Sequence, residues 1–130
     1  IILHESDVST IRSIENYPVN LIYQDNKGYG DALIKGIETC TTDYFSIFNA
    51  DGSFNPSELK TMLFYIKKDN YDFVFGSRYQ KNSGSEDDTI ITLVGNHIFS
   101  WIGRFIFNLN ISDILYTFVV GKTDKAKKLN

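Results

Sequence analysis

The feature that most constrains the fold is an alternation of short apolar runs with longer segments of helical periodicity. The apolar runs, each expected to form a strand, cover residues 1–3, 19–23, 44–48, 73–75 and 116–120. The helical patterns cover residues 10–16, 30–39, 56–68 and 90–109, and a short helix is expected after Thr123. Strands that alternate with helices are typical of βαβ units around a parallel sheet. The sequence therefore predicts one α/β domain over residues 1–130, Rossmann-like, with a mostly parallel sheet flanked by helices.

The helix expected at residues 56–68 has the most complete local pattern. Asn55 can cap its start, Pro56 suits its first turn, and Glu58 stands where a capping-box carboxylate belongs. The apolar residues that follow repeat at i, i+3, i+4 and i+7, and they are Leu59, Met62, Leu63 and Ile66. This spacing predicts one apolar stripe that packs on the sheet.

Composition narrows the choice of partners and of compartment. The net charge of −3 excludes the strong positive field of a nucleic-acid-binding domain, so no nucleic-acid partner is expected. Cys40 is the only cysteine, which rules out an internal disulfide and favours a reducing, cytoplasmic location. No uninterrupted apolar run reaches the roughly 18 residues of a membrane span. The chain opens in an apolar run at Ile1, so we expect a further strand to precede it in the sheet.

The first candidate for ligand binding is the glycine-containing segment at residues 26–32, which follows an expected strand and opens an expected helix. Gly28 and Gly30 let the backbone turn sharply and approach a ligand, and the N–H groups at the helix start can bind an anion. Lys27 adds a positive charge beside them. A plain glycine-containing loop explains the segment equally well, and as a dinucleotide fingerprint it lacks its third glycine.

The second candidate is the acidic residue at the end of the strand expected at residues 44–48. Asp51 stands where ligands bind in open α/β sheets, outside the carboxyl end of a strand. A carboxylate there can hold Mg²⁺ or Mn²⁺, which prefer oxygen ligands. Asn49 and Ser53 offer further oxygen atoms on either side. The alternative is that Asp51 only starts a turn.

Two later positions complete the set of candidate residues. Arg78 follows the strand expected at residues 73–75, where its guanidinium suits bidentate binding of a phosphate, or else forms a surface ion pair. Asp113 follows Ser112 beyond the long helix, and on its own it reads as the cap of a turn. Between them lies a polar stretch, residues 77–89, that is expected to form a surface loop.

Taken in order, these segments resemble family 2 glycosyltransferases, especially the polyprenyl-phosphate sugar transferases of the dolichyl-phosphate mannosyltransferase type. Residues 26–30 resemble the family's Asn-x-Gly-x-Gly segment, and residues 49–51 followed by Pro56 resemble its Asp-x-Asp element. Residues 76–79 match its Gly-Ser-Arg-aromatic signature. The later Gly-Asn, Ser-Asp and aromatic positions are matched by Gly95-Asn96, Ser112-Asp113 and Phe118.

The resemblance implies a GT-A-type fold, lacking here its first strand, and a nucleotide-diphosphate sugar as donor. It assigns Glu5, Asp7, Lys27, Gly28 and Gly30 to nucleotide binding, and it assigns Mg²⁺ or Mn²⁺ to Asp51, Asn49 and Ser53. It places Asp51, Arg78 and Asp113 in the catalytic set. It further implies a polyprenyl phosphate as acceptor, met at the cytoplasmic face of a membrane. The resemblance also implies that the glycine segment, Asp51 and Arg78 lie together along one rim of the domain.

Two other functions remain open at this point. Gly28 and Gly30, with Asp51 about 20 residues further on, also fit an NAD- or FAD-type dinucleotide domain. A non-catalytic nucleotide-sugar-binding relative is the other alternative, because Asn49 stands where the family has the first acid of its metal element. Losing that carboxylate removes a full charge that would face the cation.

Overall fold

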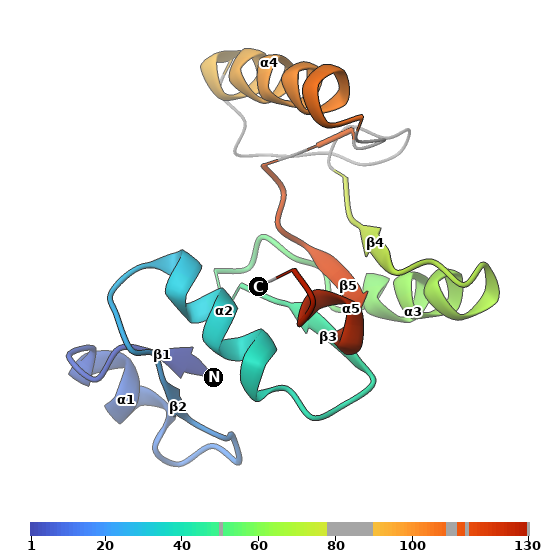
Figure 1. Ribbon diagram of the computed structural model, residues 1–130. Helices are drawn as coiled ribbons and strands as arrows, with labels where there is room; N and C mark the ends of the chain where they lie inside the picture. The colour runs from blue at the N-terminus through green and yellow to red at the C-terminus, as the bar shows by residue number, and fades with distance from the viewer. Residues whose placement is uncertain (50, 78–89, 109–111, 114, 130) are drawn as a thin grey trace. The chain divides into compact units, whose positions relative to one another are not determined.

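The computed structural model describes residues 1–49, 51–77, 90–108, 112–113 and 115–129 (Figure 1). The chain forms two compact units. Unit 1 consists of Ile1–Phe45 together with Lys122–Asn130, and unit 2 consists of Ser46–Gly121.

Unit 1 contains a two-stranded parallel sheet and three helices. Strand β1 (Ile2–Leu3) pairs with β2 (Ile22–Tyr23), with Ile2 opposite Ile22 and Leu3 opposite Tyr23. The helices are α1 (Val8–Ile14), α2 (Tyr29–Thr39) and the short α5 (Thr123–Ala126). Each strand is followed by a helix, so the βαβ pattern expected from the sequence is confirmed here.

Helix α2 packs closely on β1, and a glycine makes the close approach possible. A Cβ added at Gly36 would come within 2.4 Å of the Cδ1 atom of Ile2. Figure 1 shows α2 lying beside β1. The helix therefore contacts the Ile2 side chain so closely that a larger residue at position 36 would displace that side chain.

The residues after β5 return to unit 1 and are held there by hydrogen bonds. The backbone N–H of Thr123 donates to the carbonyl of Asp43 at 2.9 Å. The Nζ atom of Lys127 donates to the carbonyl of Cys40 at 2.8 Å. Thr123 and Ala126 are buried. Two stretches far apart in the sequence thus build one unit.

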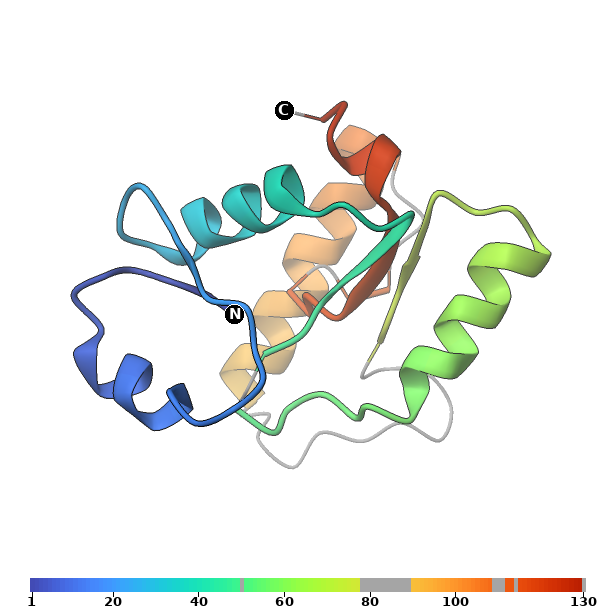
Figure 2. The ribbon, with the colours of Figure 1, turned by 90° about the horizontal axis from the view of Figure 1, so that it is seen from below.

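Unit 2 is centred on a three-stranded sheet in the order β3-β5-β4 (Figure 2). The strands, which lie wholly or in part within unit 2, are β3 (Tyr44–Ile47), β4 (Phe73–Phe75) and β5 (Val119–Lys122). Helix α3 (Glu58–Lys68) packs beside β4, and α4 (Ile90–Phe107) is the longest of the described helices. In α3 the predicted apolar stripe is confirmed, since Met62 and Ile66 are buried whereas Phe64 and Tyr65 are exposed.

The sheet differs from the expected one in two respects. The strands fall into two sheets, and β4 and β5 run antiparallel, with Val74 opposite Val120. The antiparallel pairing arises because the segment before β5 runs back along the end of β4, where the Gly76 N–H donates to the Phe118 carbonyl at 2.8 Å. Of the two pairings described by residue register, β1–β2 is parallel and β4–β5 is antiparallel, so the expectation of a mostly parallel sheet is confirmed in part.

Several predicted boundaries are corrected by local contacts. The first helix begins at Val8 and not at residue 10, because Asp7 caps it. The third begins at Glu58, because Asn55 closes a separate turn by accepting from the N–H and hydroxyl of Ser57. The strand expected at residues 116–120 is β5 at Val119–Lys122, since Tyr116 and Phe118 pack against Phe54 before the ladder starts.

The remaining boundaries differ by one to three residues. The strand expected at residues 19–23 is shortened to Ile22–Tyr23, because a tight turn bonds the Val19 N–H to the Tyr17 carbonyl. The long helix ends at Phe107, and the following Asn108 has a φ of 52°. That left-handed conformation ends a helix.

Candidate functional site

The loops that follow β1 and β2 leave the same edge of the parallel sheet in unit 1. Leu3 is opposite Tyr23, and the N–H of Gln24 donates to the Leu3 carbonyl at 3.0 Å. In α/β sheets, ligands bind at the edge where parallel strands have their carboxyl ends. The residues predicted to bind the nucleotide lie in the segments that leave this edge, and they are Glu5, Asp7, Lys27, Gly28 and Gly30.

The glycine segment is closed by side chains on both of its sides. Asp31 accepts from the N–H and from the Nδ2 of Asn26, each at 3.0 Å. Gln24 donates through Nε2 to the carbonyl of Gly28 at 3.1 Å. The hydrogen bonds from Asn26, first its side chain and then its backbone, lower the pKa of the Asp31 carboxyl. The loop therefore carries a fixed negative charge and a defined backbone path.

Gly28 has a backbone conformation that other residues adopt only with strain. Its φ is 122° and its ψ is 155°, directly before the first turn of α2. Apart from the adjacent residues and the helix's own backbone, no described atom lies within 4 Å of a Cβ built at Gly28 or Gly30. The backbone at the start of α2 is thus uncovered among the described residues, and binding of an anion by its N–H groups stays a prediction.

Asp7, one of the two acids predicted to contact the nucleotide, also has a role in the fold. Its carboxylate accepts from the Thr10 N–H at 3.2 Å, from the Thr10 hydroxyl at 2.7 Å and from the Ser9 hydroxyl at 3.0 Å. These bonds, that of the Thr10 side chain foremost, lower the pKa of the Asp7 carboxyl. Glu5 is exposed. The predicted contact of either acid with a base or ribose stays a prediction.

Asp51 lies in unit 2, in an exposed turn between β3 and α3. Its Oδ1 atom accepts from the Ser53 hydroxyl at 2.6 Å and from the Ser53 N–H at 3.0 Å, while Gly52 has a φ of 83°. The hydroxyl first and the N–H second lower the pKa of the Asp51 carboxyl, which therefore stays ionised at neutral pH. The alternative reading of Asp51 as a turn residue is thus correct, and it is compatible with an exposed charge that can bind a cation.

A cluster of aromatic side chains packs next to this turn. Phe54 stacks on Phe118 with ring centroids 4.7 Å apart, and Phe48 packs edge-on against both rings. Phe118 is completely buried and Phe54 is 5% exposed. Tyr116 packs edge-on against Phe54 at 5.1 Å and donates from its hydroxyl to the Ser53 carbonyl at 3.1 Å. The acidic turn is therefore tied to the segment that precedes β5.

The end of β4 joins the same cluster. A Cβ at Gly76 would lie 3.1 Å from Cε1 of Tyr116 and 3.2 Å from Cδ1 of Phe118, so the two segments touch. Beside it, the Ser112 hydroxyl donates to the Ser77 hydroxyl at 2.8 Å. Three segments singled out in the sequence, namely those around Asp51, Gly76 and Ser112, thus meet in unit 2.

The other predicted residues of unit 2 have mixed outcomes. Asp113 is only 1% exposed, so its carboxylate is set back from solvent and takes part in interactions within the fold. Asn49 is half-buried and also has interaction partners. Arg78 lies outside the described residues, as does the loop at residues 78–89. The catalytic role of Asp113 and the metal-binding role of Asn49 stay predictions.

Sequence reasoning missed the aromatic cluster and, above all, Tyr116. The expected strand at residues 116–120 would have used the backbone of Tyr116 in a ladder, whereas the structure uses its ring and its hydroxyl. The aromatic content of the sequence did not predict this cluster, because Phe and Tyr occur in any protein core. The closest clue was the spacing of Phe48 and Phe54 on both sides of Asp51, which places a ring at each end of the turn.

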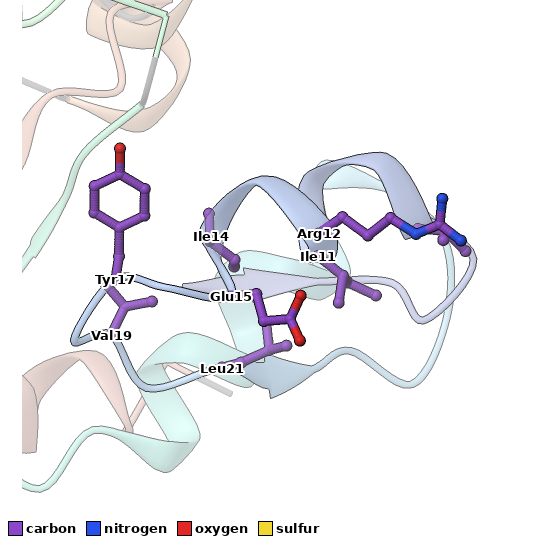
Figure 3. A pocket seen from close by; sticks show the side chains of 8 residues that line it. Ile11, Arg12, Ile14, Glu15, Tyr17, Val19 and Leu21 are labelled. Atoms are coloured by element: carbon purple, nitrogen blue, oxygen red, sulfur yellow. The ribbon is translucent and has the colours of Figure 1, made fainter.

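The hollows described in unit 1 do not coincide with the predicted site. One of about 510 Å³ lies between α1 and the segment that leads into β2, and it is lined mainly by apolar side chains such as Ile11, Ile14 and Leu21 (Figure 3). Another of about 650 Å³ lies beside Cys40 and α5. Neither includes a residue predicted to bind nucleotide or metal. An apolar hollow without converging polar groups does not suit a charged ligand.

Fold and geometry define a class: an α/β domain that presents a glycine loop and an acidic turn after its strands, as nucleotide-binding domains do. The comparison with known families is more specific. The family model described as glycosyl transferase family 2 matches residues 5–129, and the chain belongs to this family. The fold is accordingly of the GT-A type, and family membership implies a transferase that takes its sugar from a nucleotide-sugar donor.

Members of this family commonly use divalent metal ions, and the acidic turn offers a partial fit to one. Among the described residues, no three His, Cys, Asp or Glu side chains gather into a metal cluster. The ionised carboxylate of Asp51 is exposed and can supply one oxygen ligand. Mg²⁺ and Mn²⁺ suit such an open site, because they are commonly held by one or two carboxylates and complete their shell with water and phosphate.

Proposed function

We propose that this glycosyltransferase binds the diphosphate of its donor at the Asp51 turn, together with Mg²⁺ or Mn²⁺. The observation that carries the proposal is the ionised Asp51 carboxylate, which is exposed and accepts hydrogen bonds from Ser53. The segments around Gly76 and Ser112 meet at the same place. Asn49 and Ser53 are the further candidate ligands. Glu5, Asp7 and Lys27, with the backbone at Gly28 and Gly30, are the residues of unit 1 that we propose to bind nucleotide.

In the reaction, an oxygen atom of the acceptor forms a bond to the anomeric carbon of the sugar. The bond from that carbon to the diphosphate oxygen breaks, and its electron pair leaves with the nucleoside diphosphate. A bound cation would offset the charge that develops on the diphosphate. The protein's own share is to orient the donor and to stabilise the leaving group, for which Arg78 is the proposed cationic side chain. An acceptor that is itself an anionic phosphate needs no strong general base.

The test of this proposal is the replacement Asp51→Asn. Removing the carboxylate should weaken Mn²⁺-dependent binding of UDP- or GDP-sugars by roughly 10- to 100-fold or more. Loss of a residue that only supports a metal ligand already lowers metal affinity by about that factor. Isothermal titration with and without Mn²⁺ measures the change. Asp69→Asn, which removes a carboxylate after the last turn of α3, serves as the matched control. Metal-independent binding that is equal in both variants would refute the role of Asp51.

The variant Asn49→Asp separates a transferase from a binding module. It restores a second carboxylate beside the cation and should tighten Mn²⁺ binding. Sugar transfer that is absent both before and after this change, in a protein that still binds the donor, would favour a non-catalytic relative. Binding of NAD(H) that is indifferent to metal would favour the dinucleotide alternative.

We further propose that the acceptor is a lipid-linked phosphate met at the cytoplasmic face of a membrane. The support comes from α4, which buries small residues and exposes large apolar ones. Ser100 and Gly103 are buried, whereas Trp101 is 64% and Phe105 is 78% exposed, with their rings stacked 5.6 Å apart. Such a face suits the boundary between headgroups and acyl chains. None of the described helices is long and apolar enough to cross a membrane.

Vesicle binding tests this part of the proposal. The double variant Trp101→Ser/Phe105→Ser should lower co-sedimentation with phosphatidylcholine–phosphatidylglycerol vesicles about tenfold or more, because it removes two large rings from the exposed face. Phe64→Ser, which removes an exposed ring from α3, is the control. Equal sedimentation of all three proteins would mean that the apolar face of α4 is covered by protein and not by lipid.

A further inference from the structure

The acidic turn contains little that could hold its shape by itself. Asp51, Gly52 and Ser53 are all exposed, and among the described residues the hydrogen bonds within the turn run from Ser53 to Asp51. Gly52, at a φ of 83°, adds backbone freedom, since glycine visits many conformations. A carboxylate that binds a cation needs a fixed direction, so another part of the fold must supply the constraint.

Tyr116 is the side chain that supplies this constraint. Its hydroxyl donates to the carbonyl of Ser53, the residue whose N–H and hydroxyl hold Asp51. Its ring packs edge-on against the buried Phe54, the next residue along the chain. One side chain therefore binds the turn through its backbone and anchors it through the adjacent core.

The ring of Tyr116 also meets Gly76, the residue that follows β4. Its Cε1 atom lies 3.1 Å from the position of a Cβ at Gly76, so a residue larger than glycine would push the ring away. The Gly76 N–H is bonded to the Phe118 carbonyl, two residues beyond Tyr116. Tyr116 thus stands between the segment with the proposed metal ligands and the strand end that leads to Ser77 and Arg78.

We infer that Tyr116 is a positioning residue: its hydroxyl holds the Ser53 carbonyl and thereby keeps the Asp51 carboxylate in the direction in which it receives a cation. The inference rests on the proposed function in so far as Asp51 is taken as the cation ligand. Tyr116 itself touches neither donor nor metal in this scheme.

The first test needs no ligand. Tyr116→Phe removes the hydroxyl but keeps the ring, so the melting temperature should change little. The Ser53 amide should exchange with water about 2- to 10-fold faster, the factor that one neutral hydrogen bond represents. Tyr71→Phe, which removes an exposed hydroxyl from the loop before β4, is the matched control.

The second test measures the cation. Mn²⁺ with UDP as the probe nucleotide should bind the wild type about 2- to 10-fold more tightly than Tyr116→Phe, and equally to the wild type and Tyr71→Phe. If the wild type binds no Mn²⁺, the proposed function fails, and the exchange data still decide the role of Tyr116. Exchange of the Ser53 amide at the same rate in wild type and Tyr116→Phe would overturn the inference. Amides of β5 serve as the internal reference for global stability.

Discussion

Asp7 illustrates, at the scale of single residues, how a side chain in a predicted binding loop can also be required by the fold. The resemblance to the family placed it at the nucleotide, and the structure shows that both of its oxygen atoms accept hydrogen bonds from the first turn of α1. Asp51 has the same double character, because it closes a turn and yet remains exposed. Residue type and spacing could predict the positions of these acids, but the local hydrogen bonds that orient them depend on conformations visible only in the fold.

The lowered pKa of Asp7 predicts how stability depends on pH. Because the pKa of Asp7 in the folded protein lies below the ordinary Asp value of about 3.9, the stabilisation is fully present above that pH and is lost as the pH falls through the folded pKa. Asp7→Asn should therefore melt at a lower temperature than the wild type near neutral pH, and the gap should narrow below about pH 4. Circular dichroism melts measure the gap. Asp69→Asn is the control, and a gap for Asp7→Asn that stays constant down to acid pH would contradict the assignment.

At the scale of elements, the sequence predicted the type and order of the described helices and strands well. Short apolar runs and helical periodicity indicate which segments can bury one face, and the buried stripe on α3 confirms this for that helix. What the pattern could not predict was the direction of β5 and its start. Both depend on the close contact between Gly76 and the rings of Tyr116 and Phe118, which joins residues about 40 positions apart.

The contact at Gly76 supplies a prediction at this scale. Gly76→Ala should destabilise the protein by about 1–3 kcal/mol, because the added methyl group overpacks a junction that contains the buried ring of Phe118. Gly95→Ala, in α4, has no described atom within 4 Å of the new Cβ and should be neutral or stabilising by up to about 1 kcal/mol. Urea denaturation measures both variants. Equal effects would show that the junction at Gly76 is less closely packed than described.

At the scale of the whole molecule, the predicted ligands divide between the two units. The candidate nucleoside-binding residues belong to unit 1, whereas Asp51 and the segments that meet around it belong to unit 2. The expectation of one rim shared by the glycine segment, Asp51 and Arg78 stays a prediction. Local sequence patterns could identify each segment but carry no information on how distant segments combine, and the expectation of one domain over residues 1–130 stays a prediction.

The contact between the residues after β5 and the rest of unit 1 can be measured through the reactivity of the Cys40 thiol. Its Sγ atom lies 3.3 Å from the Thr42 hydroxyl and 3.6 Å from the Thr123 hydroxyl. Burial raises the pKa of the Cys40 thiol, but the hydrogen bonds of Thr42 and Thr123 and the charge of Lys127 outweigh it, so the pKa is lowered overall. Thr123→Val should therefore raise that pKa and slow alkylation by iodoacetamide near neutral pH about two- to fivefold.

A neighbouring hydroxyl provides the comparison for this measurement. Thr41→Val removes a hydroxyl that lines the same hollow but is not among the groups that lower the thiol's pKa. Its alkylation rate should match that of the wild type. If both variants react alike, the contact between the returning segment and Cys40 does not persist in solution.

The same return has a consequence for synthesis on the ribosome. Residues 1–45 emerge before unit 2, whereas the segment that donates to Cys40 and Asp43 emerges only after it. At roughly 5–20 residues per second, the 76 intervening residues take about 4 to 15 seconds to translate. During this interval the carbonyls of Cys40 and Asp43 lack the donors that the returning segment supplies, whereas unit 2, being continuous, can begin to fold as it leaves the exit tunnel.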